Sequence, residues 1–160
     1  MDVFSPEGYR QLAEFRHRIR QYLHFSEQAA RANEIEPQQH QLMLAIKGLP
    51  EGTKPTVTML SSRLCLKHHS TVELVNRLVE RGAAKRQQSL EDRREVLVSL
   101  TELGEEILQK LATLHWQELQ TSGPELCKSL QQIVDKVPTL VSKKGEETPE
   151  TQVPAAASQG

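Results

Sequence analysis

Residues 89–104 read SLEDRREVLVSLTELG, and this stretch decides the fold. Residues 91–94 are a run of adjacent charges, EDRR, and the alternation that follows puts Val96, Val98 and Leu100 on one side. Alternation with a period of two is typical of a half-buried strand. The charged run therefore predicts the tip of a β-hairpin, and the LTELG that follows predicts the start of a helix.

The residues before the charged run predict the rest of a winged helix-turn-helix. A first strand is expected over residues 83–89. Two helices are expected over residues 54–66 and 70–82, with the KHH of residues 67–69 as a tight turn between them. Helix, turn, helix and hairpin is the order of a winged helix-turn-helix, whose second helix enters the major groove.

Apolar residues spaced by three and four predict long helices at both ends of the chain. Ser5 is a candidate cap for the first helix, Pro37 starts a second, and the SGP of residues 122–124 is expected to interrupt the last long helix. The fold class is therefore mainly α with a small β-hairpin wing. The predicted parts are an N-terminal helix (1–36), a winged helix-turn-helix (37–100), C-terminal helices (101–138) and a disordered tail (139–160).

Composition limits the classes of function. The chain has 160 residues, few aromatic residues (4%) and two cysteines that form no CxxC pair, which favours a helical protein in a reducing compartment. It contains no apolar run of about 18 residues and no secretory signal, so we expect a cytoplasmic protein that has no membrane association. Cys65 is expected to be buried as a small apolar side chain.

Charge is distributed unevenly although the whole chain carries only −1. Residues 54–94 hold nine Lys or Arg against four Asp or Glu, a net +5. A basic segment between acidic ends indicates an anionic partner, and double-stranded DNA fits this order of elements. At the hairpin tip we expect Arg93 to reach a minor groove while Asp92 holds the loop by pairing with Arg94. The alternatives are a solvated turn of mixed charge and a winged-helix module that binds protein.

Two motifs resemble the MarR family of bacterial transcriptional regulators. EDRREVLVSLTELG is similar to the family's wing, D-x-R followed by a strand and L-T-x-x-G, and VNRLVERG is similar to V-D-R-L-x-x-x-G at the end of its recognition helix. The resemblance covers about residues 8–137. It implies a homodimer held by the first and last helices, which reads a palindromic operator and acts as a repressor more often than as an activator. The DNA contacts it implies are Lys67, His68, His69, Ser70, Thr71, Asn76 and Arg77 on the recognition helix and Asp92, Arg93 and Arg94 on the wing.

Two positions depart from the family pattern. Asn76 stands in place of the usual Asp, and Glu73 stands where many members carry a basic residue. The spacing from Ser70 to Glu73 also fits a capping box, which would start the helix at Ser70. The family alignment starts it about two residues earlier, at Lys67 or His68, and the sequence leaves both readings open.

Histidines outside the winged segment suggest an effector site. His40 aligns with a zinc ligand of zinc-sensing MarR members, and His115 lies near the position of a second one, while His24 is on the first helix. The alternatives are hydrogen-bonded histidines in a crevice between helices, a zinc site, and a pocket for a small organic anion, which the family commonly binds. Arg20, His24, His40 and His115 are the candidate lining. No catalytic constellation is present, so we expect no enzyme activity, no resident cofactor and no bound metal.

Overall fold

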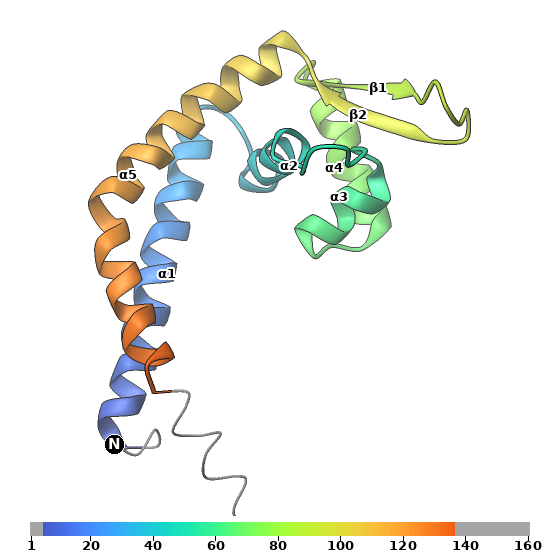
Figure 1. Cartoon of the computed structure of the whole chain (residues 1–160). Helices are drawn as coiled ribbons and strands as arrows, with labels where there is room; N and C mark the ends of the chain where they lie inside the picture. The colour runs from blue at the N-terminus through green and yellow to red at the C-terminus, as the bar shows by residue number, and fades with distance from the viewer. Residues whose placement is uncertain (1–4, 137–160) are drawn as a thin grey trace, which may run out of the picture. The chain divides into compact units, whose positions relative to one another are not determined.

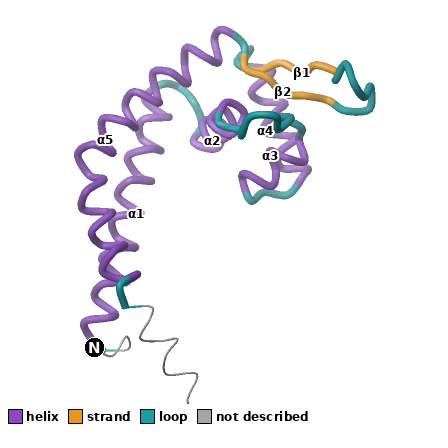
Figure 2. The backbone as a smooth tube through the Cα atoms, viewed as in Figure 1, coloured by secondary structure: helices purple, strands orange, loops and turns teal. Residues whose placement is uncertain are grey.

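The computed structural model describes residues 5–136 and confirms a mainly helical chain with a single antiparallel hairpin in that range (Figures 1 and 2). The predicted tail, residues 139–160, lies outside the described residues. Contacts divide the described chain into two compact units, residues 19–124 and residues 5–18 with 125–136. The elements are α1 (Pro6–Ala32), α2 (Pro37–Lys47), α3 (Val57–Leu64), α4 (His68–Glu80), β1 (Ala84–Gln88), β2 (Val96–Leu100) and α5 (Glu102–Val134).

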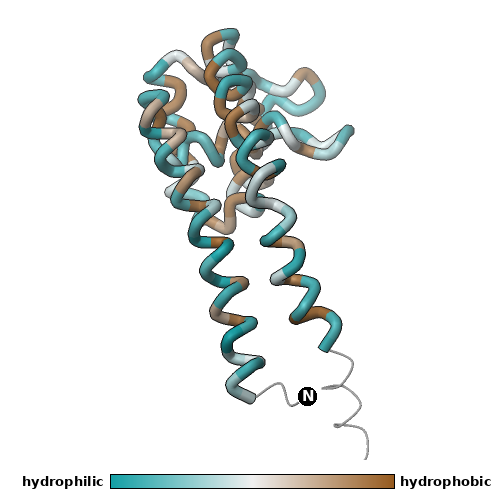
Figure 3. The backbone as a smooth tube through the Cα atoms, turned by 90° about the vertical axis from the view of Figure 1, so that its left-hand side faces the viewer, coloured by the Kyte–Doolittle hydropathy of each residue, from teal (hydrophilic) through white to brown (hydrophobic). Residues whose placement is uncertain are grey.

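The two long helices, α1 and α5, alternate hydrophobic and hydrophilic positions along their length (Figure 3). At the start of α1, the Ser5 hydroxyl accepts a hydrogen bond from the backbone N–H of Gly8, as expected of a cap. Several large apolar side chains of these helices stay exposed in the single chain, including Tyr9, Leu12, Leu130 and Val134.

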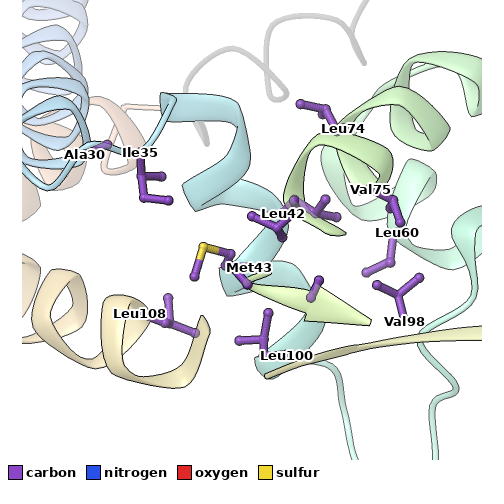
Figure 4. Close-up of a cluster of buried hydrophobic side chains, with 13 residues drawn as sticks. Ala30, Ile35, Leu42, Met43, Leu60, Leu74, Val75, Val98, Leu100 and Leu108 are labelled. Atoms are coloured by element: carbon purple, nitrogen blue, oxygen red, sulfur yellow. The ribbon is translucent and has the colours of Figure 1, made fainter. Parts of the chain in front are cut away.

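The core of the unit formed by residues 19–124 lies where α2, α3, α4 and β2 meet (Figure 4). Leu42, Leu60, Leu78 and Val98 are fully buried there, and Met43 points toward Leu100 and Leu108. Burying each such side chain stabilises the fold by about 1.5–3 kcal/mol before entropy is subtracted. This core fixes the position of α4 and of the hairpin that follows it.

The hairpin pairs β1 with β2 from Ala84 opposite Leu100 to Gln88 opposite Val96. Val98 and Leu100 are buried as predicted, whereas Val96, nearest the tip, is exposed. The other edge of β2 is also used, because the N–H of Val98 donates to the carbonyl of Pro55 at 2.9 Å. The wing is thus bonded to the segment that enters α3.

The LTELG motif joins the wing to α5 through close backbone contacts. The Thr101 hydroxyl donates to the Gly82 carbonyl at 2.6 Å and accepts from the N–H of Gly104 at 3.2 Å, so it caps α5. A Cβ on Gly104 would lie 2.0 Å from the carbonyl oxygen of Ala83. Only glycine allows the first turn of α5 to approach the turn between α4 and β1 this closely.

Three expectations from the sequence were wrong. The KHH stretch is not a turn: α4 begins at His68, with Lys67 as an extended N-cap, so the Ser70–Glu73 capping box does not form. α5 runs through SGP with Pro124 inside it, since one missing N–H, at about 3 kcal/mol, is too small a cost to end a helix with long flanks. Cys65 is exposed, because it adopts a left-handed conformation (φ 53°) as the C-cap of α3.

Candidate nucleic-acid interface

Helix α4 has one buried face and one exposed face. Thr71, Leu74, Val75 and Leu78 are buried and hold the helix against the core. At 100° per residue the opposite face carries His69, Glu73, Asn76 and Glu80, all of them exposed. The exposed face is therefore free for a partner, and it carries a mixture of donors and acceptors.

The predicted contacts on α4 fall into two groups. Thr71 is fully buried and its hydroxyl donates to the carbonyl of Lys67, so it serves the core and cannot reach a partner in this arrangement. Ser70 is half-buried. The other five predicted residues are exposed, namely Lys67, His68, His69, Asn76 and Arg77.

The N-terminus of α4 is open. No side chain caps it at Lys67, so backbone N–H groups of the first turn keep no side-chain partner. Such a helix end, with the positive end of its dipole, favours a negative group such as a phosphate. His68 and His69 stand in this first turn and are exposed.

The wing tip, residues 89–95, is shaped by hydrogen bonds to short polar side chains. The Ser89 hydroxyl accepts from the N–H groups of Glu91 and Asp92, at 3.3 and 3.4 Å. Asp92 accepts a hydrogen bond from the backbone N–H of Arg94 at 2.9 Å. It therefore braces the loop through the main chain, and the predicted pairing with the Arg94 side chain does not form. Within the described residues, the guanidinium groups of Arg93 and Arg94 make no hydrogen bond or ion pair.

Lys54 anchors the wing tip to the segment before α3. Its ammonium group lies 2.7 Å from Glu91 and 2.8 Å from Glu95. Hydrogen bonds to these two carboxylates raise the pKa of Lys54, and the bond to Lys54 lowers the pKa of Glu91. Lys54 therefore adds little free positive charge to the interface, and its role was missed because nothing local in the sequence pairs residues this far apart.

Asn76 is tied to the root of the wing. The Arg86 guanidinium, on β1, donates a short hydrogen bond to Oδ1 of Asn76. The contact connects α4 to the hairpin and leaves the amide NH₂ of Asn76 as its free group. Asn76, in place of the family's Asp, thus keeps an acceptor for an arginine of the strand.

A cleft at the base of the wing joins three elements. It has a volume of about 510 Å³, and its polar lining is Thr56 and Thr58 at the start of α3, His68 of α4, and Arg94 and Glu95 of the wing tip. The carboxylate of Glu95 is paired with Lys54. Arg94 and the open end of α4 therefore lie at one surface. With the Glu95 carboxylate paired to Lys54, the guanidinium, the imidazole and the two hydroxyl groups are suited to an anion such as a backbone phosphate.

The predicted effector residues are only partly brought together. The rings of His40 and His115 are both buried, with centroids 4.8 Å apart. His115 bonds to the Ser26 hydroxyl at 2.8 Å and to the Leu111 carbonyl at 2.6 Å, while Nδ1 of His40 is buried without a partner among the described residues. Arg20 and His24 are exposed on α1.

A larger cleft lies elsewhere in the same unit. It has a volume of about 740 Å³, with Leu44, Leu100 and Leu108 on its apolar part and the Lys47–Glu105 ion pair beside them. None of the four predicted effector residues lines it. Between residues 5 and 136 no group of three or more His, Cys, Asp or Glu side chains is arranged to hold a metal ion.

Comparisons with known proteins agree with this geometry. The sequence profile of the MarR family matches residues 34–95. AbsC, a MarR family transcriptional regulator from Streptomyces coelicolor, shares the fold with a TM-score of 0.68, 15% identity, and coverage of 91% of this chain and 100% of that one. None of the curated protein sequences matches the chain.

Two further solved structures share the fold and have informative names. A mutant of MarR from E. coli complexed with operator DNA has a TM-score of 0.60 and 23% identity, over 91% of this chain and 99% of that one. BpsR from Bordetella bronchiseptica, described in terms of regulation of DNA binding by 6-hydroxynicotinic acid, has a TM-score of 0.57 and 16% identity, over 77% of this chain and 94% of that one.

No helix in the described range is both long and apolar enough to cross a membrane. The structural likenesses lie below 25% identity and establish the fold. The sequence match covers α2, α3, α4, β1 and the wing tip, and it ends just before β2. The chain therefore shares its fold with MarR family proteins, and residues 34–95 match the sequence profile of that family.

Proposed function

We propose that the protein is a transcriptional regulator that binds double-stranded DNA through α4 and the wing tip. The observation that carries the proposal is the cleft in which His68, at the open end of α4, and Arg94, of the wing tip, meet. A helix that enters the major groove and a hairpin that reaches the next phosphates need this juxtaposition. The operator complex of the E. coli MarR mutant supports the same use of the fold.

Each exposed group has a distinct role in this proposal. His68, Lys67 and the N–H groups of the first turn of α4 contact phosphate, and they set the register on the duplex. Arg93, at the tip, enters a minor groove, where the negative potential is enhanced when the groove is narrow. Arg94 contacts the phosphate beside the cleft, and the hydrogen bond that its backbone N–H donates to Asp92 holds the loop that presents both arginines.

We propose further that the protein acts as a homodimer on a palindromic operator, as a repressor in the cytoplasm. Two winged modules related by a two-fold axis read two half-sites, so contacts at both half-sites contribute to the affinity for the operator. A small organic anion is the proposed effector, by analogy with the named regulation of BpsR. Arg20, His24, His40 and His115 are the first residues to test for it.

The second candidate is a winged-helix module that binds protein. It is favoured by Glu73, an unpaired acid near the centre of the exposed face of α4, which is unusual on a surface that faces phosphate. Salt dependence separates the two, because release of counterions makes DNA affinity fall steeply as salt rises.

Replacement of the wing arginines tests the proposed function. Arg93→Ala and Arg94→Ala should each weaken binding to duplex DNA by about 1–3 kcal/mol per subunit. Each should also lower the slope of log affinity against log salt by about one per contact, or about two per dimer. The Arg93→Ala variant should lose more affinity at A·T-rich sites, where the minor groove is narrow, than at other sites. Fluorescence anisotropy across a salt series measures all three effects.

Arg16→Ala on α1 is the matched control, because Arg16 is exposed and lies outside the winged segment. It removes the same charge and should leave both affinity and slope near the wild-type values. If the two wing variants behave like this control, the wing tip is a solvated turn and the protein-binding candidate takes precedence.

A further inference from the structure

Glu73 is the one acid among the residues on the N-terminal half of the exposed face of α4. It is the sixth residue of the helix and lies one turn after His69 and just under one turn before Asn76. In helix-turn-helix proteins the N-terminal part of the recognition helix reaches the base edges. A carboxylate at this place would be repelled by phosphate, so its presence needs a reason.

The simplest reason, a solubilising ion pair along the helix, does not hold here. Arg77 stands four residues after Glu73, the spacing at which such pairs usually form. On α1 the same spacing does produce pairs, Arg18 with Glu14 and Arg31 with Glu27. Across residues 5–136, however, no hydrogen bond or ion pair involves the carboxylate of Glu73.

The neighbouring side chain, Asn76, limits the hydrogen bonds that this part of α4 can offer to a partner. Oδ1 of Asn76 is already occupied by Arg86, so Asn76 offers only its NH₂ group, a donor. A glutamate carboxylate has two oxygen atoms that accept hydrogen bonds and no donor. The exposed face of α4 therefore carries one free acceptor of full charge next to a donor that is held in place.

We propose that Glu73 reads a cytosine in the major groove by accepting a hydrogen bond from its N4 amino group. This inference deepens the proposed DNA-binding function and rests on it. Guanine presents two acceptors to the groove and thymine an acceptor and a methyl group, so both repel a carboxylate. Adenine presents a donor but sets the N7 acceptor beside it, whereas the N4 donor of cytosine has a C–H as its neighbour.

The same carboxylate also increases selectivity in a second way. On any duplex without cytosine at that place, Glu73 sits unpaired among phosphates and base acceptors, which costs binding free energy. Glu73 thus lowers affinity for non-specific DNA while it favours the matching site. The acid is in this way compatible with a DNA-binding surface.

Selection of bound duplexes from a randomised library tests the inference on the full chain. Wild type should enrich a site with one fixed C·G pair per half-site. Glu73→Gln has nearly the same shape but can bond adenine through N6 and N7 together, so its preference at that pair should move to A·T. Glu73→Ala should enrich the same site but show no preference for any base pair at that position.

Anisotropy titrations on the selected duplex then give the size of the effect. Changing the fixed C·G pair to A·T should lower the affinity of wild type for the duplex by about 5- to 100-fold. The same change should raise the affinity of the Glu73→Gln variant and alter that of Glu73→Ala by no more than about twofold. Glu80→Gln removes the same charge near the end of α4, on the same face, and should keep the wild-type preference.

The outcomes separate this inference from the function on which it rests. If wild type binds duplex DNA with steep salt dependence but Glu73→Gln and Glu73→Ala enrich the wild-type site unchanged, Glu73 reads no base and the inference fails alone. The inference also fails alone if wild type binds DNA but enriches no C·G pair. If wild type binds no duplex at all, the proposed function itself fails.

Discussion

At the scale of single residues, the buried pair His40 and His115 is the feature with a measurable consequence for stability. Burial of the imidazole, with a smaller contribution from the neighbouring His115, lowers the pKa of His40 to about 4. In an unfolded chain a histidine titrates near 6.5, so protons bind the unfolded state better. The contribution of His40 to stability is therefore complete above pH 6.5 and is lost as the pH falls toward 4.

We expect the free energy of unfolding to fall by about 1 kcal/mol from this group between pH 7.5 and 5.5. His40→Gln carries no titratable group and should lack that part of the decrease, whereas His24→Gln, at an exposed site, should keep it. Urea denaturation at the two pH values measures the difference. An identical pH dependence in wild type and His40→Gln would show that His40 takes up its proton without a cost to the fold.

At the scale of elements, the junction between the hairpin and α5 depends on Gly104. A methyl group there would meet the backbone of Ala83 at 2.0 Å, and neither backbone can move without disturbing β1 or the cap formed by Thr101. Gly104→Ala should therefore destabilise the protein by about 3 kcal/mol, the upper end for overpacking. A thermal denaturation curve measures the loss.

Gly123→Ala is the matched control for this prediction, because Gly123 lies in the same helix and a Cβ there meets nothing within 4 Å. It should be neutral or stabilise the helix by about 0.5–1 kcal/mol. If Gly104→Ala melts like wild type, the close approach of α5 to the turn between α4 and β1 does not limit stability.

Elements whose signals are local could be predicted from the sequence. The alternation in β2, the cap at Ser5 and the Pro37 start of α2 gave the right elements, because each depends on residues within one or two turns. The start of α4 was ambiguous in the sequence, because two different caps fit the same residues. The continuation of α5 through Pro124 depends on the helical segments on both sides of that proline.

The same limit applies to the candidate site. The exposed basic residues of the wing tip followed from the motif, and the structure places Arg93 and Arg94 there without partners among the described residues. The links from Lys54 to Glu91 and from Arg86 to Asn76 depend on folding and have no periodic signal. The burial of Thr71 follows from the start of α4, which fixes the face on which each of its residues lies.

At the scale of the whole molecule, the unit formed by residues 5–18 and 125–136 has no apolar core of its own. Among its described residues only Gly8 and Ser129 are buried, while Tyr9, Leu12, Leu130 and Val134 are exposed by 44–60%. Two helical segments that expose this much apolar surface are stabilised by covering it against another surface. A second copy of the chain is the partner that the proposed function requires.

We therefore expect wild type to sediment as a dimer at micromolar concentration. Leu130→Glu places a charge on this apolar surface, and the change occurs on both subunits, so the dimer should dissociate roughly 100-fold more readily or not form. Gln132→Glu adds the same charge at an exposed position about 200° around the same helix from Leu130, and it should remain dimeric.

Trp116 gives an independent measurement of the same equilibrium. It is the only tryptophan and is 70% exposed in the single chain, so its emission reports whether a partner covers it. If α5 is part of the interface at that point, dilution of wild type through the dissociation constant should shift the emission to longer wavelength. Leu130→Glu should show the long-wavelength emission at all concentrations. A wild-type protein that sediments as a monomer at micromolar concentration would contradict the dimer, and the reading of a palindrome by two winged modules would fail with it.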